Sequence, residues 1–478
     1  MRTLQANGTS VSAAHVIVPT FGAIALLVNT MLPYLGYTEA SAPCTLVLAC
    51  LFVMYLVVTR PLFSVSLLYM MVLALTAFVA GVGIESGGLM IETGVQGEPN
   101  GAFSRLLVFY VIFIGFSMVG FRWFVRERTS HVPQALITLE KKSVMLGFGL
   151  ALAIIGAGIV AGLTEGFALL QGVNRYALRN QSTESDSVLF NLFLNNQMFL
   201  ALLLGALATS KDRLVRWFAI LLIIVTAGLD MLHGEQFMSV LHFGLTVLTP
   251  IVAMLVLNGK PVLRYVVIGA AITLIIGGAS VFTAYQGQGL DANATLTSRS
   301  LLQGQVWYVV DNDSGLFTPP PAGGQPAFTR FVRSLLVSSA PSFDNDSAIS
   351  GLRDVMVAYG VPTLIRTYVK DNISFTMGQM AVPVFWFGLV GGAVFVAFTG
   401  VLYGALCALQ IALAMRGGVV MLWLIVKVLS YASFGIQQGE YWSFFGVRAL
   451  FYIALTILWW VLVDSPSMAQ KMKQAVQT

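Results

Sequence analysis

Residues 285–380 read YQGQGLDANATLTSRSLLQGQVWYVVDNDSGLFTPPPAGGQPAFTRFVRSLLVSSAPSFDNDSAISGLRDVMVAYGVPTLIRTYVKDNISFTMGQM, and this stretch decides the fold of the chain. It is polar and punctuated by Pro and Gly, whereas the sequence on both sides is almost continuously apolar. Its cationic side chains are five arginines and one lysine, namely Arg299, Arg330, Arg333, Arg353, Arg366 and Lys370. We expect a large loop between two membrane spans that holds much of any chemistry the chain performs.

The composition of the whole chain is that of a membrane protein. It is 57% hydrophobic and 10% charged, with a mean hydropathy of +0.83, whereas a soluble domain carries about 25% charged residues. The net charge of +5 comes from basic residues scattered over short loops, which is not the pattern of a nucleic-acid-binding protein. Cys44, Cys50 and Cys407 lie in apolar runs and offer neither a disulfide framework nor a metal site.

Apolar stretches long enough to cross a bilayer predict an all-α, polytopic fold with about 12 transmembrane helices. We divide the chain into a bundle of nine spans (1–284), the loop (285–380), and three further spans with a tail (381–478). The predicted spans are 14–36, 43–59, 62–84, 102–120, 144–164, 188–208, 214–232, 236–257, 262–284, 381–414, 418–436 and 445–463. The tenth is long enough to be tilted or to begin as an interfacial helix.

The positive-inside rule orients these spans. If both termini are cytoplasmic, one side collects most of the basic residues of the short connections, whereas the other side carries Glu39, Glu85, Glu92 and Glu98. The basic set is Arg60, Arg122, Arg126, Arg128, Lys141, Lys142, Lys211, Arg213, Arg216, Lys260, Arg264, Arg416, Lys471 and Lys473. The large loop is therefore predicted to be extracytoplasmic.

Eight arginines break this rule, because they fall on the outer side. Five are in the large loop, Arg175 and Arg179 follow the fifth span, and Arg448 enters the twelfth. Individually they could be surface arginines paired with nearby carboxylates. Collectively, with Lys370 the only lysine of the large loop, they favour recognition of a multidentate anion, because the guanidinium fork matches phosphate oxygens.

Short amphipathic helices are predicted within the loop. Residues 296–310 form one, with Thr297 or Ser298 as cap, Arg299 in its first turn, and Trp307 and Tyr308 at the membrane interface. An irregular linker follows at 311–326, and then come further helical segments at 328–339 and 347–360, followed by 361–370 with Arg366. Such helices would cap a cavity between the spans; the alternative is a simple spacer.

Two stretches in this framework resemble the oligosaccharide-repeat-unit (O-antigen, Wzy-type) polymerases. LTSRSLLQGQVWYVVD is similar to the arginine-containing segment that opens the large loop of that family, and it puts Arg299 in the place of the characteristic arginine. ISFTMGQMAVPVFWFGLVGG is similar to the segment that re-enters the membrane before a Phe-Gly-x-x-Gly helix. The chain departs from the family between spans seven and eight, where LDMLHGEQF has no arginine.

Candidates for proton transfer lie near the outer ends of spans. His233 and Glu235 occupy the turn after span seven, where they are either functional or merely solvated, and histidine suits proton transfer near neutral pH. Glu440 precedes span twelve and could instead form an ion pair with Arg448. We expect the general base to be one of His233, Glu235 or Glu440.

The resemblance implies a GT-C-like glycosyltransferase that works without metal or other cofactor at the periplasmic face of a bacterial inner membrane. Its donor and acceptor would be oligosaccharides on undecaprenyl pyrophosphate, transferred with inversion at the anomeric carbon. Partners would include a chain-length regulator and a repeat-unit flippase. The arginines expected to bind the pyrophosphate are Arg299, Arg175, Arg179, Arg353, Arg366 and Arg448.

Two other functions stay open. A polysaccharide ligase of the O-antigen type would share the architecture and the arginine site. A transporter or flippase of lipid-linked sugars would instead place charges at mid-membrane depth within its spans.

Overall fold

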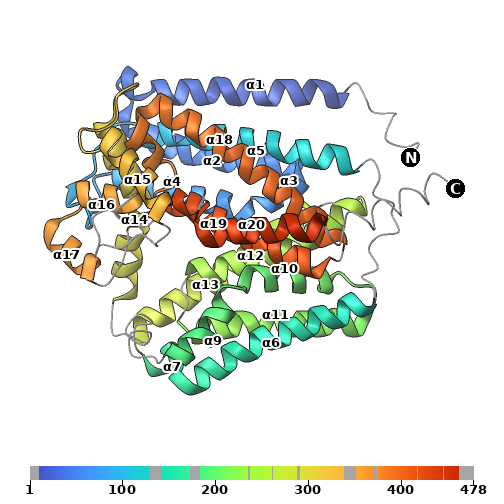
Figure 1. Ribbon diagram of the computed structural model, residues 1–478. Helices are drawn as coiled ribbons and strands as arrows, with labels where there is room; N and C mark the ends of the chain where they lie inside the picture. The colour runs from blue at the N-terminus through green and yellow to red at the C-terminus, as the bar shows by residue number, and fades with distance from the viewer. Residues whose placement is uncertain are drawn as a thin grey trace.

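The computed structural model describes residues 10–129, 141–172, 184–234, 237–260, 262–287, 291–337, 351–370, 375, 377–416, 418–444 and 446–461. In a bilayer, backbone polar groups must be satisfied within the protein, which favours helices. Figure 1 shows the long helices side by side, with the helices of the large loop gathered at one end of the bundle. We call this end the loop face; it carries α14 (Ala292–Asp313), α15 (Gln325–Val337), α16 (Leu352–Tyr359) and α17 (Pro362–Lys370).

The chain is a multi-pass, α-helical membrane protein. Nine helices in its described part are long and apolar enough to cross a membrane. They are α2 (Thr38–Thr59), α4 (Leu68–Glu85), α5 (Ala102–Thr129), α6 (Lys141–Glu165), which runs on towards α7 (Ala168–Gln171), α11 (Arg213–Leu232), α12 (Phe237–Leu257), α13 (Leu263–Gly287), α18 (Ala381–Arg416) and α19 (Val419–Gln438).

A tenth span is formed if two bent helices are counted together. These are α9 (Glu184–Leu194) and α10 (Gln197–Ala208), which meet at an angle of 49°. The first and last predicted spans correspond to α1 (Ser10–Met31) and α20 (Val447–Trp459), whose described apolar parts are shorter. The third begins with the short helix α3 (Pro61–Ser66). Every predicted span thus has a helical counterpart, while the number that cross the membrane and their orientation stay predictions.

Helices α5 and α18 pack most closely, because glycines let their backbones approach. A Cβ on Gly120 would lie 2.0 Å from the carbonyl oxygen of Val401, and one on Gly404 would lie 1.9 Å from that of Ser117. Small residues allow this kind of close helix packing within membranes. Helices α14, α15 and α16 of the loop face also contact α18, whereas α14 packs mainly on α4.

Gly120→Ala is accordingly expected to lower the unfolding free energy by about 1–3 kcal/mol, because the added methyl overpacks the interface. Gly115 lies on the same helix with open space where its Cβ would be, so Gly115→Ala is the matched control. It should be neutral or slightly stabilising, since Ala has the higher helix propensity. Thermal unfolding of both purified variants measures the difference, and equal melting temperatures would exclude close α5–α18 packing.

The long predicted span at 381–414 is kinked rather than straight. Gly388 interrupts α18 with φ +70°, a left-handed conformation that glycine adopts without strain. The backbone of Thr318 lies 3.0 Å from the position of a Cβ there. The amides of Leu389 and Val390 donate to the carbonyls of Gly315 and Leu316 at 3.3 and 3.0 Å. The kink therefore attaches the irregular linker of the large loop to the bundle.

A small β-hairpin completes the loop face. Strands β1 (Leu89–Met90) and β2 (Val95–Gln96) pair antiparallel in the connection between α4 and α5, with Leu89 opposite Gln96 and Met90 opposite Val95. Gly94 turns the hairpin with φ +69°. The turn places Glu92 against the helices of the large loop.

Candidate functional site

Helix α14 begins earlier than the sequence suggested. Asp291 caps it, since its Oδ1 accepts from the amide of Asn293 at 3.0 Å. The hydroxyls of Thr297 and Ser298, the expected caps, instead donate back to carbonyls within the helix at 2.9 and 3.0 Å. Arg299 therefore lies well inside the helix rather than in its first turn. It remains exposed, with its guanidinium carbon 5.2 Å from the centre of the Tyr285 ring.

Trp307 and Tyr308, which were expected at the membrane interface, pack into the protein interior rather than being exposed. Both are buried, at 3% and 2% exposure, where α14 packs on α4 and α5. The Trp307 indole donates to the carbonyl of Ala102 at 2.8 Å, and the Tyr308 hydroxyl donates to that of Glu98 at 3.0 Å. Burial with hydrogen-bonded polar ends gives these aromatic rings a packing role. Helix α14 is thus a fixed part of the loop face.

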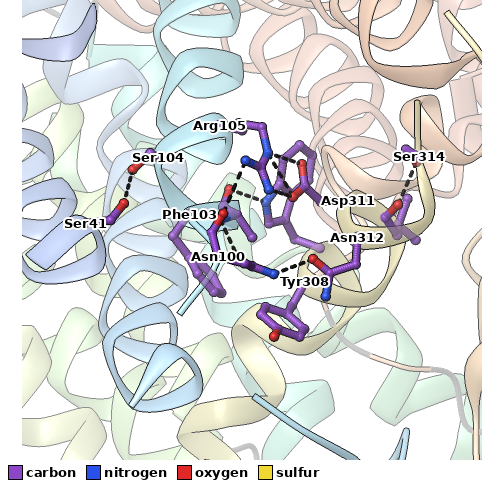
Figure 2. A network of polar contacts seen from close by, with 12 residues as sticks. Ser41, Asn100, Phe103, Ser104, Arg105, Tyr308, Asp311, Asn312 and Ser314 are labelled. Atoms are coloured by element: carbon purple, nitrogen blue, oxygen red, sulfur yellow. Dashed lines mark hydrogen bonds and ion pairs between the residues drawn. The ribbon is translucent and has the colours of Figure 1, made fainter. Parts of the chain in front are cut away.

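An ion pair anchors the carboxyl end of α14. Figure 2 shows Arg105 of α5 directed at Asp311, with Nε 3.0 Å from each carboxylate oxygen. Beside it, the Asn100 side-chain amide donates to the Asn312 side chain. Burial raises the pKa of the Asp311 carboxyl, and Arg105 partly opposes this effect. We did not predict this pair from the sequence, although an arginine at the outer end of a predicted span was a visible signal.

Glu92 joins the hairpin to α14 and α17. Its carboxylate accepts hydrogen bonds from the side chain of Gln305 and from the hydroxyl of Tyr368, the latter at 2.7 Å. Its backbone carbonyl accepts from the amide of Val361 at 2.9 Å. Burial raises the pKa of Glu92, and the hydrogen bonds and the positive charge of Arg299 oppose this. The helix with Arg299 and the helix with Arg366 therefore meet at one carboxylate.

A second buried ion pair joins Arg353 of the large loop to Glu440 of the bundle. Arg353, on α16, donates from Nη1 to the carboxylate of Glu440 at 2.8 Å, and the two residues are 8% and 3% exposed. Glu440 follows Gly439, the residue that caps α19, and leads into the 3-10 helix η3 (Tyr441–Phe444). The adjacent Asp354 accepts from Arg330 of α15 at 2.7 Å. From the sequence, Arg353 was expected to bind phosphate and Glu440 to act as a base, with Arg448 as the possible ion-pair partner of Glu440.

Polar groups continue beneath this pair into the bundle. The Tyr441 hydroxyl donates to the backbone carbonyl of Gln379 at 2.8 Å, and the Tyr110 hydroxyl donates to the Gln379 side chain at 2.9 Å. The side-chain nitrogen of Gln379 is buried and has no hydrogen-bond partner among the described residues. Buried polar groups are normally satisfied, so this donor is available to a bound molecule.

Asp354 makes stability depend on pH. Burial raises its pKa to about 6, with the charge of Arg330 opposing the shift. Its folded-state pKa thus exceeds the unfolded value of about 3.9. The protonated carboxyl favours the folded state, so this contribution to stability is lost as pH rises from about 4 to about 6. Melting temperatures across this range should decline more in the wild type than in Asp354→Asn, and identical pH profiles would contradict this assignment.

The other arginine candidates are spread over the loop face or lie outside the described residues. Arg366 on α17 and Arg448 at the start of α20 are exposed. Arg448 lies near the phenol of Tyr431. Arg175, Arg179 and Glu235 fall outside the described residues, as does the side chain of Arg333. The structure thus brings Arg353 together with Glu440.

His233 occupies a different part of the bundle from Glu440. It is 6% exposed at the end of α11, and one ring nitrogen lies 2.9 Å from the carbonyl oxygen of Gly158 on α6. Its ring centre is 5.2 Å from that of Phe167, 4.9 Å from Phe190 and 5.8 Å from Phe193. This packing joins α6, α7, α9 and α11, and it favours a structural role for His233.

Lys427, a buried lysine inside the bundle, was not among the site residues predicted from the sequence. Lys427 on α19 is 7% exposed and donates to the carbonyl of Asn195, in the break between α9 and α10. The Trp423 indole donates to the side chain of Asn196 at 2.9 Å. On the other side of the break, Gln197 donates to Asp230, which is fully buried. An ionisable residue within an apolar run indicates a functional site by default. The lysine in the run VVMLWLIVKVLS could therefore have been selected from the sequence.

Comparison with known protein families gives one match, which covers part of the chain. A family model described as a family of unknown function (DUF6418) matches residues 345–453. The matched segment contains both Arg353 and Glu440, together with the kinked helix α18 and the lysine of α19. No curated protein and no solved structure matches the chain. Among the described residues, His, Cys, Asp and Glu side chains form no group of three or more that could hold a metal ion.

Proposed function

We propose that the chain is a membrane glycosyltransferase that polymerises oligosaccharide repeat units carried on a polyprenyl pyrophosphate, with its active site beneath the loop face. The observation that supports this most is the buried Arg353–Glu440 pair, which joins a candidate phosphate ligand and a candidate base at 2.8 Å. The segments around Arg299 and Gly388 resemble those of the O-antigen polymerases, and this resemblance supports the same class of enzyme. Under this proposal the loop face is extracytoplasmic, on the periplasmic side of a bacterial inner membrane.

The pair has a chemical use in such a reaction. A pyrophosphate oxygen entering the site would compete with Glu440 for the Arg353 guanidinium, because arginine binds phosphate and carboxylate with the same fork. Glu440, released from its partner, would then accept the proton of the acceptor hydroxyl. The acceptor oxygen forms the new bond to the anomeric carbon as the bond to pyrophosphate breaks. The leaving pyrophosphate keeps the electron pair, and arginine charge stabilises it.

Arg299 and Arg366 would extend this anion site towards solvent. Both are exposed, and α14 and α17 meet at Glu92 through Gln305 and Tyr368. Guanidinium groups at successive depths suit a ligand with two linked phosphates.

Deletion of the gene in the source organism separates polymerase from ligase. A polymerase deletion leaves single repeat units on the surface and no polymer. A ligase deletion leaves finished polymer attached to the carrier lipid, and that result would overturn the polymerase assignment. An unchanged polysaccharide profile would contradict both.

Transport of a lipid-linked sugar is a second candidate function, favoured by Lys427. Transporters build their sites at mid-membrane depth from discontinuous helices, and Lys427 meets the break between α9 and α10. Reconstitution in liposomes with a fluorescent lipid-linked sugar tests this directly. Transfer between leaflets that Lys427→Met abolishes would support transport, whereas no transfer by the wild type would exclude it.

A further inference from the structure

A cavity lies at the end of the bundle opposite the loop face. It has a volume of about 550 Å³ and is lined by α2, α3, α5 and α12, a size typical of small-ligand sites. Its position follows from the helix directions. The amino ends of α2 and α5 meet at the loop face, where Ser41 and Ser104 are hydrogen-bonded at 2.6 Å, whereas the cavity involves the far ends of both helices.

Two arginines and an apolar wall line this cavity. Arg60 joins α2 to α3, and Arg122 lies near the far end of α5; both are exposed. No ion pair involves either guanidinium among the described residues, and the cavity lining includes no carboxylate. The wall is formed by side chains of Leu62, Phe63, Met118, Phe121 and Val256.

The apolar wall is a firm part of the fold. Phe63 and Phe121 meet edge to face with ring centres 5.4 Å apart, and they are 3% and 5% exposed. Cationic side chains beside such a wall fit an amphiphile whose head is anionic and whose body is hydrocarbon. A soluble phosphate would use the arginines but would leave the wall uncovered.

We propose that this cavity binds one anionic phospholipid, with the phosphate between Arg60 and Arg122 and an acyl chain against Phe63, Phe121 and Met118. Guanidinium groups match phosphate oxygens in charge and geometry. Basic groups beside apolar helices attract the anionic headgroups of the adjoining leaflet. This site does not depend on the function assigned to the loop face.

The test uses the full-length protein in nanodiscs or detergent, with phosphatidylglycerol as the probe and native mass spectrometry as the readout. Arg60→Gln/Arg122→Gln should weaken retention of phosphatidylglycerol by about tenfold or more, given the attraction of two cations near the membrane surface. The matched control is Lys211→Gln/Arg213→Gln, which removes the same charge from exposed residues outside the cavity. It should leave retention unchanged.

Three outcomes would overturn the proposal. Equal loss of lipid in the control variant would mean that lipid retention depends on surface cations in general and not on this cavity. Equal retention of phosphatidylcholine by the wild type would remove the role of headgroup charge. Displacement of the lipid by millimolar inorganic phosphate, at constant ionic strength, would indicate a soluble anion instead.

A second variant keeps the test decisive if the double arginine variant does not fold. Met118→Trp narrows the cavity while keeping both arginines. It should lower retention of phosphatidylglycerol, and it should reduce the rise in melting temperature that this lipid gives the wild type. Undiminished retention in Met118→Trp would show that the lipid binds elsewhere.

Discussion

Replacing Arg353 with Met should strongly destabilise the protein. The change leaves the Glu440 carboxylate buried, at 3% exposure, without the cation that compensates it. Breaking a buried pair in this way typically costs about 3–5 kcal/mol. Denaturant or thermal unfolding of the purified protein measures the loss, and glycosyl transfer should disappear with it.

The double variant Arg353→Met/Glu440→Gln separates stability from chemistry. Removing both charges should restore most of the lost stability, since replacing a buried ion pair by neutral groups is often nearly neutral. Activity should stay absent, because the proposed phosphate ligand and the proposed base are both gone. Arg366→Met, which removes an exposed arginine from α17, is the control for stability and should change it by less than about 0.5 kcal/mol. A stable Arg353→Met single variant would contradict the pairing.

The second large effect is expected for Arg105→Met. Asp311 would then be a fully buried carboxylate whose ion-pair partner has been removed from α5. We expect a loss of about 3–5 kcal/mol when the carboxylate is ionised. The loss should be smaller in mild acid, because burial raises the pKa of Asp311 and a protonated carboxyl needs no cation.

Unfolding of Arg105→Met at two pH values, with Asp311→Asn added to the same chain, tests this pair. The added substitution should recover stability and remove the dependence on pH. Asn312→Ala is the local control, because it removes an exposed partner of Asn100 from the next position. A loss in Arg105→Met that is the same at both pH values, and that Asp311→Asn fails to recover, would show that α14 is held by other contacts.

Apolar runs determine most of what could be predicted about this fold. A bilayer requires long apolar helices, so each predicted span has a helix, and amphipathic patterns located α15 and α16. The positions of helix breaks were harder to predict from the sequence. The kink at Gly388 depends on the backbone of Thr318. The break after Leu194 falls at the polar residues Asn195 and Asn196, inside a span that is otherwise largely apolar. Periodicity within one segment carries no information about such distant contacts.

The site was less predictable than the fold, because its charges pair across long stretches of chain. Arg353 lies 87 positions from Glu440, and Arg105 lies 206 positions from Asp311. Residue type identified Arg353 and Glu440 as candidates, yet it could not show that they touch. His233 had the right chemistry but lies among phenyl rings. Lys427 could have been found, because it is a cation within an apolar run. The positive-inside rule counts only charges in the loops, so it passed over this residue.

The most direct measurement is a polymerisation assay with purified protein, reconstituted in lipid, and a purified lipid-linked repeat unit as both donor and acceptor. Products are separated by length, and wild type is compared with Glu440→Gln and Arg299→Ala. We expect the wild type to form a ladder of longer lipid-linked products. Glu440→Gln should form no ladder, and Arg299→Ala should form a much weaker one. A wild-type protein that binds the lipid-linked repeat yet forms no longer product would contradict the proposed function.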